Sequence, residues 1–199
     1  MQSTSKFFLL FLSLFSVTLF AQKDNFNKEI TKVKGDLNKD GLIDYAEVLQ
    51  DTLNEKYPYK INIYFAEQNG SFKLNTSSTQ AIDPQYPEGK NGYSNGNSFY
   101  EIKIVKGILI ISNELIRGHF EHKFRYQNGN FELIGFSEVY SDGQGTMGTI
   151  DFNLSTGIRL KTIEPYGQDD FPVTHTKKKI VIKPLPKLQD FVPFKTEYY

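Results

Sequence analysis

The chain has 199 residues, with 23 basic and 23 acidic side chains, 17 phenylalanines, 12 tyrosines, and neither cysteine nor tryptophan. The balanced charge gives no electrostatic footprint for nucleic acid or for an anionic membrane. The lack of cysteine excludes disulfides, zinc–thiolate sites and thiol catalysis. The length suits a single domain with a core packed largely by phenyl rings.

Residues 1–21 are predicted to be an export signal. Lys6 supplies a positive start, residues 7–20 form a largely apolar run, and Ala21 offers a small residue at the cleavage point. The run is too short and too interrupted by hydroxyl side chains for a comfortable membrane span. We therefore expect a mature chain of residues 22–199 that forms one domain in the periplasm or outside the cell, without a membrane span.

The mature chain begins with a polar lead-in over residues 22–34. Phe26, Ile30 and Val33 fall at helical spacing within it, which predicts a short helix. Gly35, a poor helix former, follows directly.

The next twelve residues, 36–47, have the spacing of a calcium-binding loop. Oxygen-bearing side chains at positions 1, 3, 5 and 9 converge on one cation, a backbone carbonyl at position 7 adds a ligand, and glycine at position 6 permits a sharp bend. Calcium prefers such oxygen ligands, whereas zinc prefers sulfur and imidazole, which this loop lacks. The alternative is a polar turn without a metal. The candidate ligands are Asp36, Asn38, Asp40, Leu42 through its carbonyl, Asp44 and, at position 12, Glu47.

The flanks of the loop bear on its structural setting. Glu47 is what an EF-hand, a helix–loop–helix, would need for bidentate closure. Gly35 disfavours a helix before the loop, and the alternation of residues 45–50 after it fits a strand at least as well as a helix. Strand–loop–strand is the favoured setting and the EF-hand is the alternative.

Residues 34–49 resemble the Gly-Asp-Leu-Asn-x-Asp-Gly-x-x-Asp signature of FG-GAP or VCBS-type repeats, in which calcium lies in a loop between β-strands. The resemblance covers about 15 residues and implies the ligands named above, except that Glu47 has no required role. The motif occurs once, so a full propeller is not expected. The whole chain resembles exported bacterial proteins with one such motif ahead of a β-rich body, and this resemblance implies no particular activity.

From Ile43 onward, short alternating runs are split by turn dipeptides, which is typical of antiparallel strands. Asn-Gly pairs favour type I′ hairpin turns, whose two central residues need positive φ. The predicted fold is mainly β, with antiparallel hairpins forming a sheet, a roll or a sandwich. The predicted hairpins join 59–66 to 71–75, 100–105 to 108–112, 120–126 to 130–136, and 149–154 to 158–163.

Two stretches do not have a strand pattern. Residues 78–98 form a long loop rich in proline, glycine and asparagine, and residues 184–199 form a proline-containing tail that we expect to cross the domain in extended form. Exposed rings near the first stretch could stack on sugars. These rings are Tyr86, Tyr93, Phe99 and Tyr100.

Three further motifs give weaker signals. Strand alternation sends His119 and His122 to opposite faces, which argues against a zinc site. Residues 143–148 match a phosphate-binding glycine pattern but precede a strand pattern instead of a helix. Thr52, between an aspartate and a leucine, matches a short O-glycosylation acceptor.

The function predicted from the sequence is an exported calcium-binding protein that acts by binding a protein or glycan or by structural association. One alternative is a calcium-assisted carbohydrate-binding module. The other is a small hydrolase, for which carboxylate pairs such as Asp142 with Asp151 offer the required groups.

Overall fold

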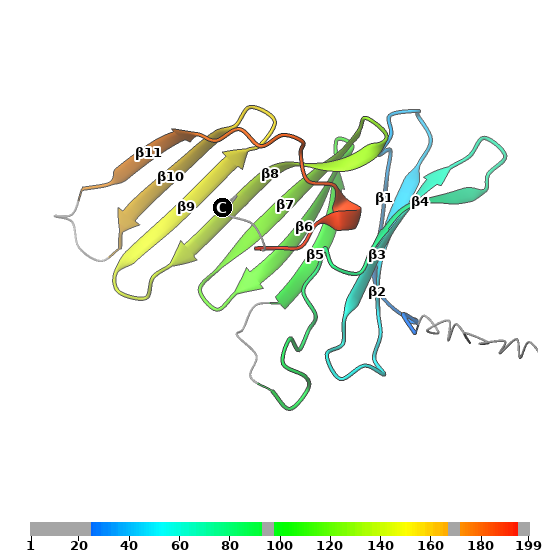
Figure 1. Cartoon of the computed structure of the whole chain (residues 1–199), viewed down its shortest axis with the longest axis horizontal. Helices are drawn as coiled ribbons and strands as arrows, with labels where there is room; N and C mark the ends of the chain where they lie inside the picture. The colour runs from blue at the N-terminus through cyan, green and yellow to red at the C-terminus, as the bar shows by residue number, and fades with distance from the viewer. Residues whose placement is uncertain (1–24, 93–97, 167–171, 195–199) are drawn as a thin grey trace, which may run out of the picture.

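The computed structural model describes residues 25–92, 98–166 and 172–194. Within these residues the chain forms eleven β-strands in two antiparallel sheets (Figure 1). The prediction of a mainly β fold built from antiparallel hairpins is therefore confirmed. The predicted export signal lies outside the described residues.

The smaller sheet has four strands, which lie side by side in chain order. Its inward face carries Ala46, Val48, Ile61 and Ile63, none of which is more than 1% exposed. Burial of this row holds the sheet against the rest of the domain. The strands are β1 (Lys28–Gly35), β2 (Asp44–Gln50), β3 (Tyr59–Ala66) and β4 (Phe72–Ser78).

The larger sheet has seven strands, again in chain order, so the whole chain is a pair of meanders. Its edges are β5, which lies beside β1 of the smaller sheet, and β11 at the far end of the molecule (Figure 1). The strands are β5 (Ser98–Val105), β6 (Ile108–Leu115), β7 (Gly118–Gln127), β8 (Asn130–Ser141), β9 (Thr146–Asn153), β10 (Ile158–Pro165) and β11 (Thr174–Lys179).

All four predicted hairpins are present. In the β7–β8 turn, Asn128 and Gly129 have φ of 54° and 74°, as a type I′ turn requires. The turn at residues 69–70 differs, because only Gly70 has positive φ, and the loop is closed by a hydrogen bond from Glu67 N to Ser71 O (2.8 Å). A longer connection thus replaces the expected two-residue turn.

The prediction of a short N-terminal helix is wrong, because residues 28–35 form strand β1. Thr31, Val33 and Gly35 alternate with Lys32 and Lys34 along this strand, which is a period of two. The register shifts at a bulge between positions 29 and 31, and Ile30, the residue between them, is exposed, so the apolar residues with helical spacing do not form one buried face.

The C-terminal segment after β11 runs back across the larger sheet and meets the smaller one (Figure 1). It contains a short 3₁₀ helix, η1 (Leu188–Asp190), which contacts β4 and β8. Leu188 is fully buried and Phe191 is 4% exposed. This segment therefore closes one core shared by both sheets, whose largest fully buried side chains include Phe124, Phe131, Phe136 and Phe152.

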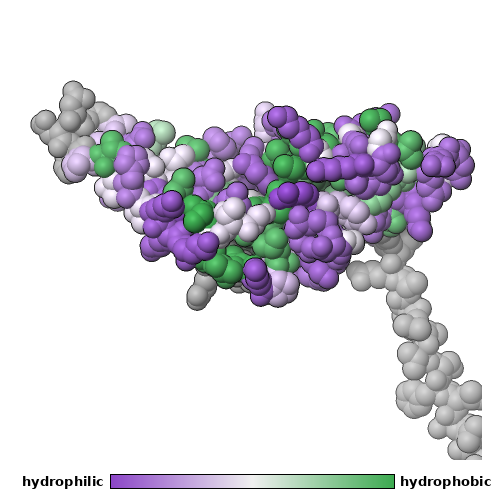
Figure 2. Space-filling view, turned by 90° about the horizontal axis from the view of Figure 1, so that it is seen from above, coloured by the Kyte–Doolittle hydropathy of each residue, from purple (hydrophilic) through white to green (hydrophobic). Residues whose placement is uncertain are grey.

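The surface seen from above is mainly hydrophilic, with smaller hydrophobic patches between the polar side chains (Figure 2). Among the residues that the structure describes, no helix is long and apolar enough to cross a membrane.

Candidate metal site in the β1–β2 loop

The calcium-loop motif lies in the connection between β1 and β2, so strands flank it on both sides. The helix–loop–helix alternative does not fit this setting. Leu37, the second loop residue, is only 1% exposed and packs into the core, which fixes the start of the loop. Lys39 and Gly41 have φ of 65° and 87°, and these left-handed residues turn the backbone sharply back toward β2.

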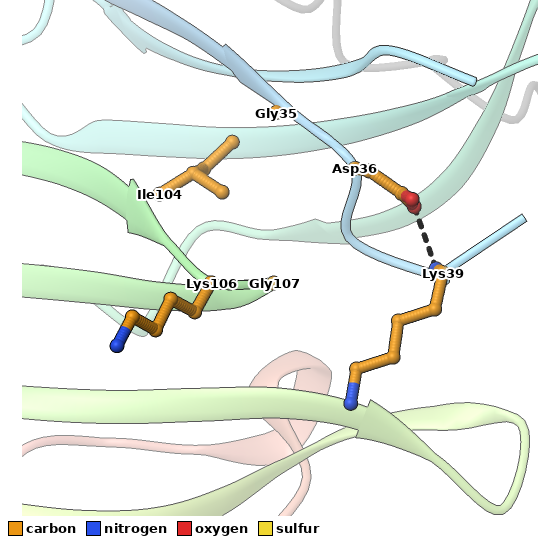
Figure 3. A pocket seen from close by; sticks show the side chains of 6 residues that line it. All are labelled: Gly35, Asp36, Lys39, Ile104, Lys106 and Gly107. Atoms are coloured by element: carbon orange, nitrogen blue, oxygen red, sulfur yellow. Dashed lines mark hydrogen bonds between the residues drawn. The ribbon is translucent and has the colours of Figure 1, made fainter. Parts of the chain in front are cut away.

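Asp36 is the first predicted ligand, and its carboxylate lies inside the bend of the loop. Oδ1 accepts a hydrogen bond from the backbone N–H of Lys39 at 2.6 Å (Figure 3). Oδ2 accepts a hydrogen bond from the backbone N–H of Gly41 at 3.0 Å. Each carboxylate oxygen has two acceptor positions, so one amide contact leaves room for a cation. Asp36 therefore both shapes the loop and keeps capacity for a metal.

Asn38 and Asp40 form the exposed part of the loop. Asn38 Oδ1 accepts the N–H of Asp40 at 3.0 Å, and Asp40 Oδ1 accepts the N–H of Leu42 at 2.8 Å. The Asn38 amide nitrogen donates to Asp40 Oδ2 at 2.8 Å. To bind calcium, this amide has to present its oxygen to the cation in place of its nitrogen.

Asp44 has a different environment, because its side chain is fully buried. Oδ2 accepts the N–H groups of Leu37 at 2.8 Å and Asn38 at 3.4 Å, while Oδ1 accepts the N–H of Ala66 at 2.9 Å. The carboxylate thus ties both ends of the loop to the end of β3. Asp44 is thus a structural clamp, and its three N–H contacts leave one acceptor position, on Oδ1, for a cation.

Glu47 lies within β2, with its side chain on the outer face of the smaller sheet. Its Oε1 accepts a hydrogen bond from Asn62 Nδ2 at 3.2 Å, and its Oε2 lies 3.6 Å from Lys32 Nζ. Asn62 in turn accepts a hydrogen bond from Ser77. Because Glu47 is part of this polar row across all four strands, we leave it out of the proposed ligand set.

Replacing Glu47 by glutamine is therefore expected to leave calcium affinity within about twofold of the wild-type value, since the side chain is held by Lys32 and Asn62. The measurement is calorimetric calcium titration. A loss of roughly a hundredfold or more would contradict this expectation and indicate a bidentate ligand.

A cavity of about 320 Å³ lies between the loop and the β5–β6 turn. Figure 3 shows Asp36 and Lys39 on the loop side, with Lys106 across from them. A Cβ added to Gly35 would lie 2.6 Å from Ile104 Cγ2. Strands β1 and β5 can therefore approach each other closely at this point only because residue 35 is a glycine. The loop therefore lies at the joint between the two sheets.

The donor chemistry of the loop fits calcium only in part. The side chains supply hard oxygen donors and no sulfur or imidazole, as calcium prefers. Among the described residues, however, no three histidine, cysteine or acidic side chains are grouped so that they could hold a metal ion. Calcium binding by this loop requires Asp36 and Asp40 to turn toward a common point.

Comparison with known proteins gave no match. No family model, curated protein or solved structure is similar to this chain. The chemistry of the loop is therefore the main guide to function.

Two of the four rings considered for sugar binding pack against other aromatic side chains of the protein. Tyr86 packs edge-on against Tyr57 at 5.3 Å, and Phe99 packs against Tyr59 at the same distance. Tyr100 is exposed, and Tyr93 lies outside the described residues.

A second aromatic group lies on the outer face of the smaller sheet, and the sequence analysis did not predict it. Tyr45 stacks on Tyr64 at 4.6 Å, Phe72 meets Tyr45 edge-on at 4.9 Å, and Lys32 Nζ lies 3.8 Å from the Tyr45 ring centre. Both faces of the Tyr45 ring are thus occupied. The alternation of Tyr45 with Ala46 in the sequence was the signal for this outward-facing row.

The remaining sequence motifs lie away from the loop. His119 is exposed and His122 is fully buried, as strand alternation predicted. Asp142 caps the glycine-containing β8–β9 turn by accepting the N–H groups of residues 144 and 146. The hydrogen bond from the Thr146 hydroxyl, followed by those from the two backbone N–H groups, lowers the pKa of Asp142. Thr52 lies in the loop after β2, beside Leu53, which is 74% exposed.

Proposed function

We propose that the β1–β2 loop binds calcium and that the chain is an exported calcium-binding protein acting by binding or structural association. The observation that carries this proposal is one sharp strand–loop–strand turn that holds Asp36, Asn38 and Asp40 near one another in the D-x-N-x-D-G spacing. The Leu42 carbonyl completes the protein ligands, and water fills the remaining positions.

Calcium supplies two physical effects in such a loop. It neutralises the carboxylates of Asp36 and Asp40, which otherwise repel each other within five residues of chain. It also fixes the loop between Leu37, which is anchored in the core, and Asp44, which is clamped to β3. Since the same loop contacts the β5–β6 turn through Gly107, the metal stabilises the joint between the sheets.

Export is part of the same proposal. It is supported by the basic start and the apolar run of residues 1–21. Extracellular and periplasmic calcium is abundant enough for a site of modest affinity to be occupied.

Calcium is expected to raise the thermal unfolding midpoint by roughly 5–11 °C relative to chelator when its concentration is about 100 times its dissociation constant. The physical reason is that only the folded loop assembles the ligands, so binding favours the folded state. The measurement is thermal unfolding of the purified protein in chelator, in calcium and in magnesium.

Asp36→Ala and Asp40→Ala are expected to abolish the calcium-dependent shift. Asp142→Ala is the matched control, because Asp142 also caps a glycine-containing turn through backbone N–H groups but lies outside the motif. Equal shifts in calcium and magnesium, or none in either, would refute the proposal and leave the loop as a polar turn.

A further inference from the structure

The far edge of the larger sheet is formed by β11, which pairs with β10 on one side only. Among the described residues, no strand pairs with its other side. Five of its six side chains are exposed, and the strand ends with Lys177, Lys178 and Lys179. An open edge of this kind presents unpaired main-chain groups to solvent.

The hydrogen-bond pattern identifies which main-chain groups face outward. Ile180 N donates to Gly157 O at 2.7 Å, in register with the β10–β11 ladder. Hydrogen-bonded pairs alternate with non-bonded pairs in antiparallel ladders. The N–H and C=O groups of His175, Lys177 and Lys179 therefore point away from β10, toward the open edge.

Positive charge is concentrated at this end of a nearly neutral chain. The sequence of residues 158–183 contains six cationic and three acidic side chains, and of the acidic ones only Glu164 lies within the described residues. Figure 2 shows hydrophilic side chains interspersed with hydrophobic ones at the end of the molecule where β10 and β11 lie in Figure 1. Among the described residues, no ion pair involves a lysine of β11.

The lysines are distributed over both faces of the sheet. Lys178 lies directly opposite Arg159 in the β10–β11 register, while Lys177 and Lys179 face the other side. Like charges directly opposite each other destabilise a strand pair. An acidic side chain on the face of Lys178 and Arg159 would offset this repulsion, and one on the opposite face would meet Lys177 and Lys179. An added strand delivers side chains alternately to both faces.

We propose that the open edge of β11 is a docking site for an extended acidic peptide segment of another protein, which adds to the sheet as a twelfth strand. Main-chain bonds to residues 175, 177 and 179 supply the pairing, and the lysines select acidic side chains. A second copy of this chain fits less well, because two β11 edges would bring their lysines together without an acidic side chain between them, and the β4 edge has no acidic side chain.

A cavity of about 290 Å³ lies at the end of this edge, lined by the apolar side chains of Leu154, Ile182 and Leu185 and by Lys179 and Lys183. Lys179 belongs to both the edge and the cavity. An aliphatic side chain at one end of the peptide can enter this space, which fixes the register of the added strand.

The test is fluorescence anisotropy of a labelled peptide of about eight residues, with glutamates on both faces and valine and threonine elsewhere, titrated with the full protein in calcium. We expect binding that weakens with salt and is lost when lysine replaces glutamate. A second peptide of the same sequence, N-methylated at alternate backbone amides, is expected to bind at least roughly tenfold more weakly because it cannot pair with the edge. Equal binding of the methylated peptide would overturn the proposal.

Two variants at one position separate charge from pairing. Lys177→Gln removes one positive charge. Lys177→Pro removes the same charge and also the backbone N–H that points toward the open edge, and an edge strand tolerates proline at such a position. We expect Lys177→Pro to bind at least roughly tenfold more weakly than Lys177→Gln. Equal affinities of the two folded variants, or tighter binding of dextran sulfate than of the peptide, would show a general anion surface and overturn strand addition.

Discussion

Replacing Asp44 by alanine is expected to lower the free energy of unfolding by about 3–5 kcal/mol. The carboxylate is fully buried and accepts hydrogen bonds from Leu37, Asn38 and Ala66. Its removal leaves these backbone N–H groups without their acceptor in a region that water does not reach. The cost of buried unsatisfied donors, more than the loss of the bonds themselves, makes the effect large.

The measurement is urea unfolding in chelator, so that loss of metal does not contribute. The control is Asp40→Ala, because Asp40 also accepts two hydrogen bonds within the loop but is exposed. We expect this control to change the free energy of unfolding by less than about 1 kcal/mol in chelator. If both variants were equally stable, Asp44 would not be a structural clamp.

The second large effect concerns pH and His122. This side chain is fully buried in the core, with the rings of Phe120, Phe136 and Phe191 within 5.4 Å of its own ring centre. Burial lowers the pKa of His122 to about 3. The imidazole is therefore neutral in the folded protein at any pH above that value.

The direction of the pH effect follows from proton linkage. A histidine in the unfolded chain has a pKa near 6.5, so between about pH 6.5 and 3 the unfolded state binds a proton that the folded state does not. Acid therefore favours unfolding through this window, and stability is fully retained above it. The expected loss is roughly 2 kcal/mol between pH 7.5 and 5, and roughly 4–5 kcal/mol once pH reaches 3.

Urea unfolding of His122→Phe and His122→Leu at pH 5–7.5 measures this contribution, since both variants remove the titrating group. Each is expected to have a flatter pH dependence than the wild type, whatever its absolute stability. His119→Phe is the control, because His119 is exposed on the same strand, and it should keep the wild-type slope. Burial raises the pKa of Glu138, an effect of opposite sign that all these proteins share. An unchanged slope in both His122 variants would contradict the assignment.

Much of the β architecture could be predicted from local sequence. Asn128 and Gly129 specify a two-residue hairpin, because both positions need positive φ and these residue types tolerate it. The alternation around His122 predicted that it faces away from His119. Turn chemistry and strand alternation act between neighbours in the chain, so the sequence carries them directly. The loop spacing at Asp36 and Asp40 is equally local, which is why the sequence by itself suggests calcium.

The remaining properties depend on residues that meet only after folding. The twelve-residue motif does not distinguish Asp44, clamped by Ala66, from Asp40, which lies in solvent. Nor does it show that Glu47 is held by Lys32 and Asn62, which lie on the neighbouring strands. The division into two sheets, the closing of their shared core by η1 and the open cationic edge of β11 are likewise set by long-range packing. Burial and unpaired edges are properties of the assembled sheets, so only the tertiary structure decides which chemically similar side chains support the fold and which remain free to bind.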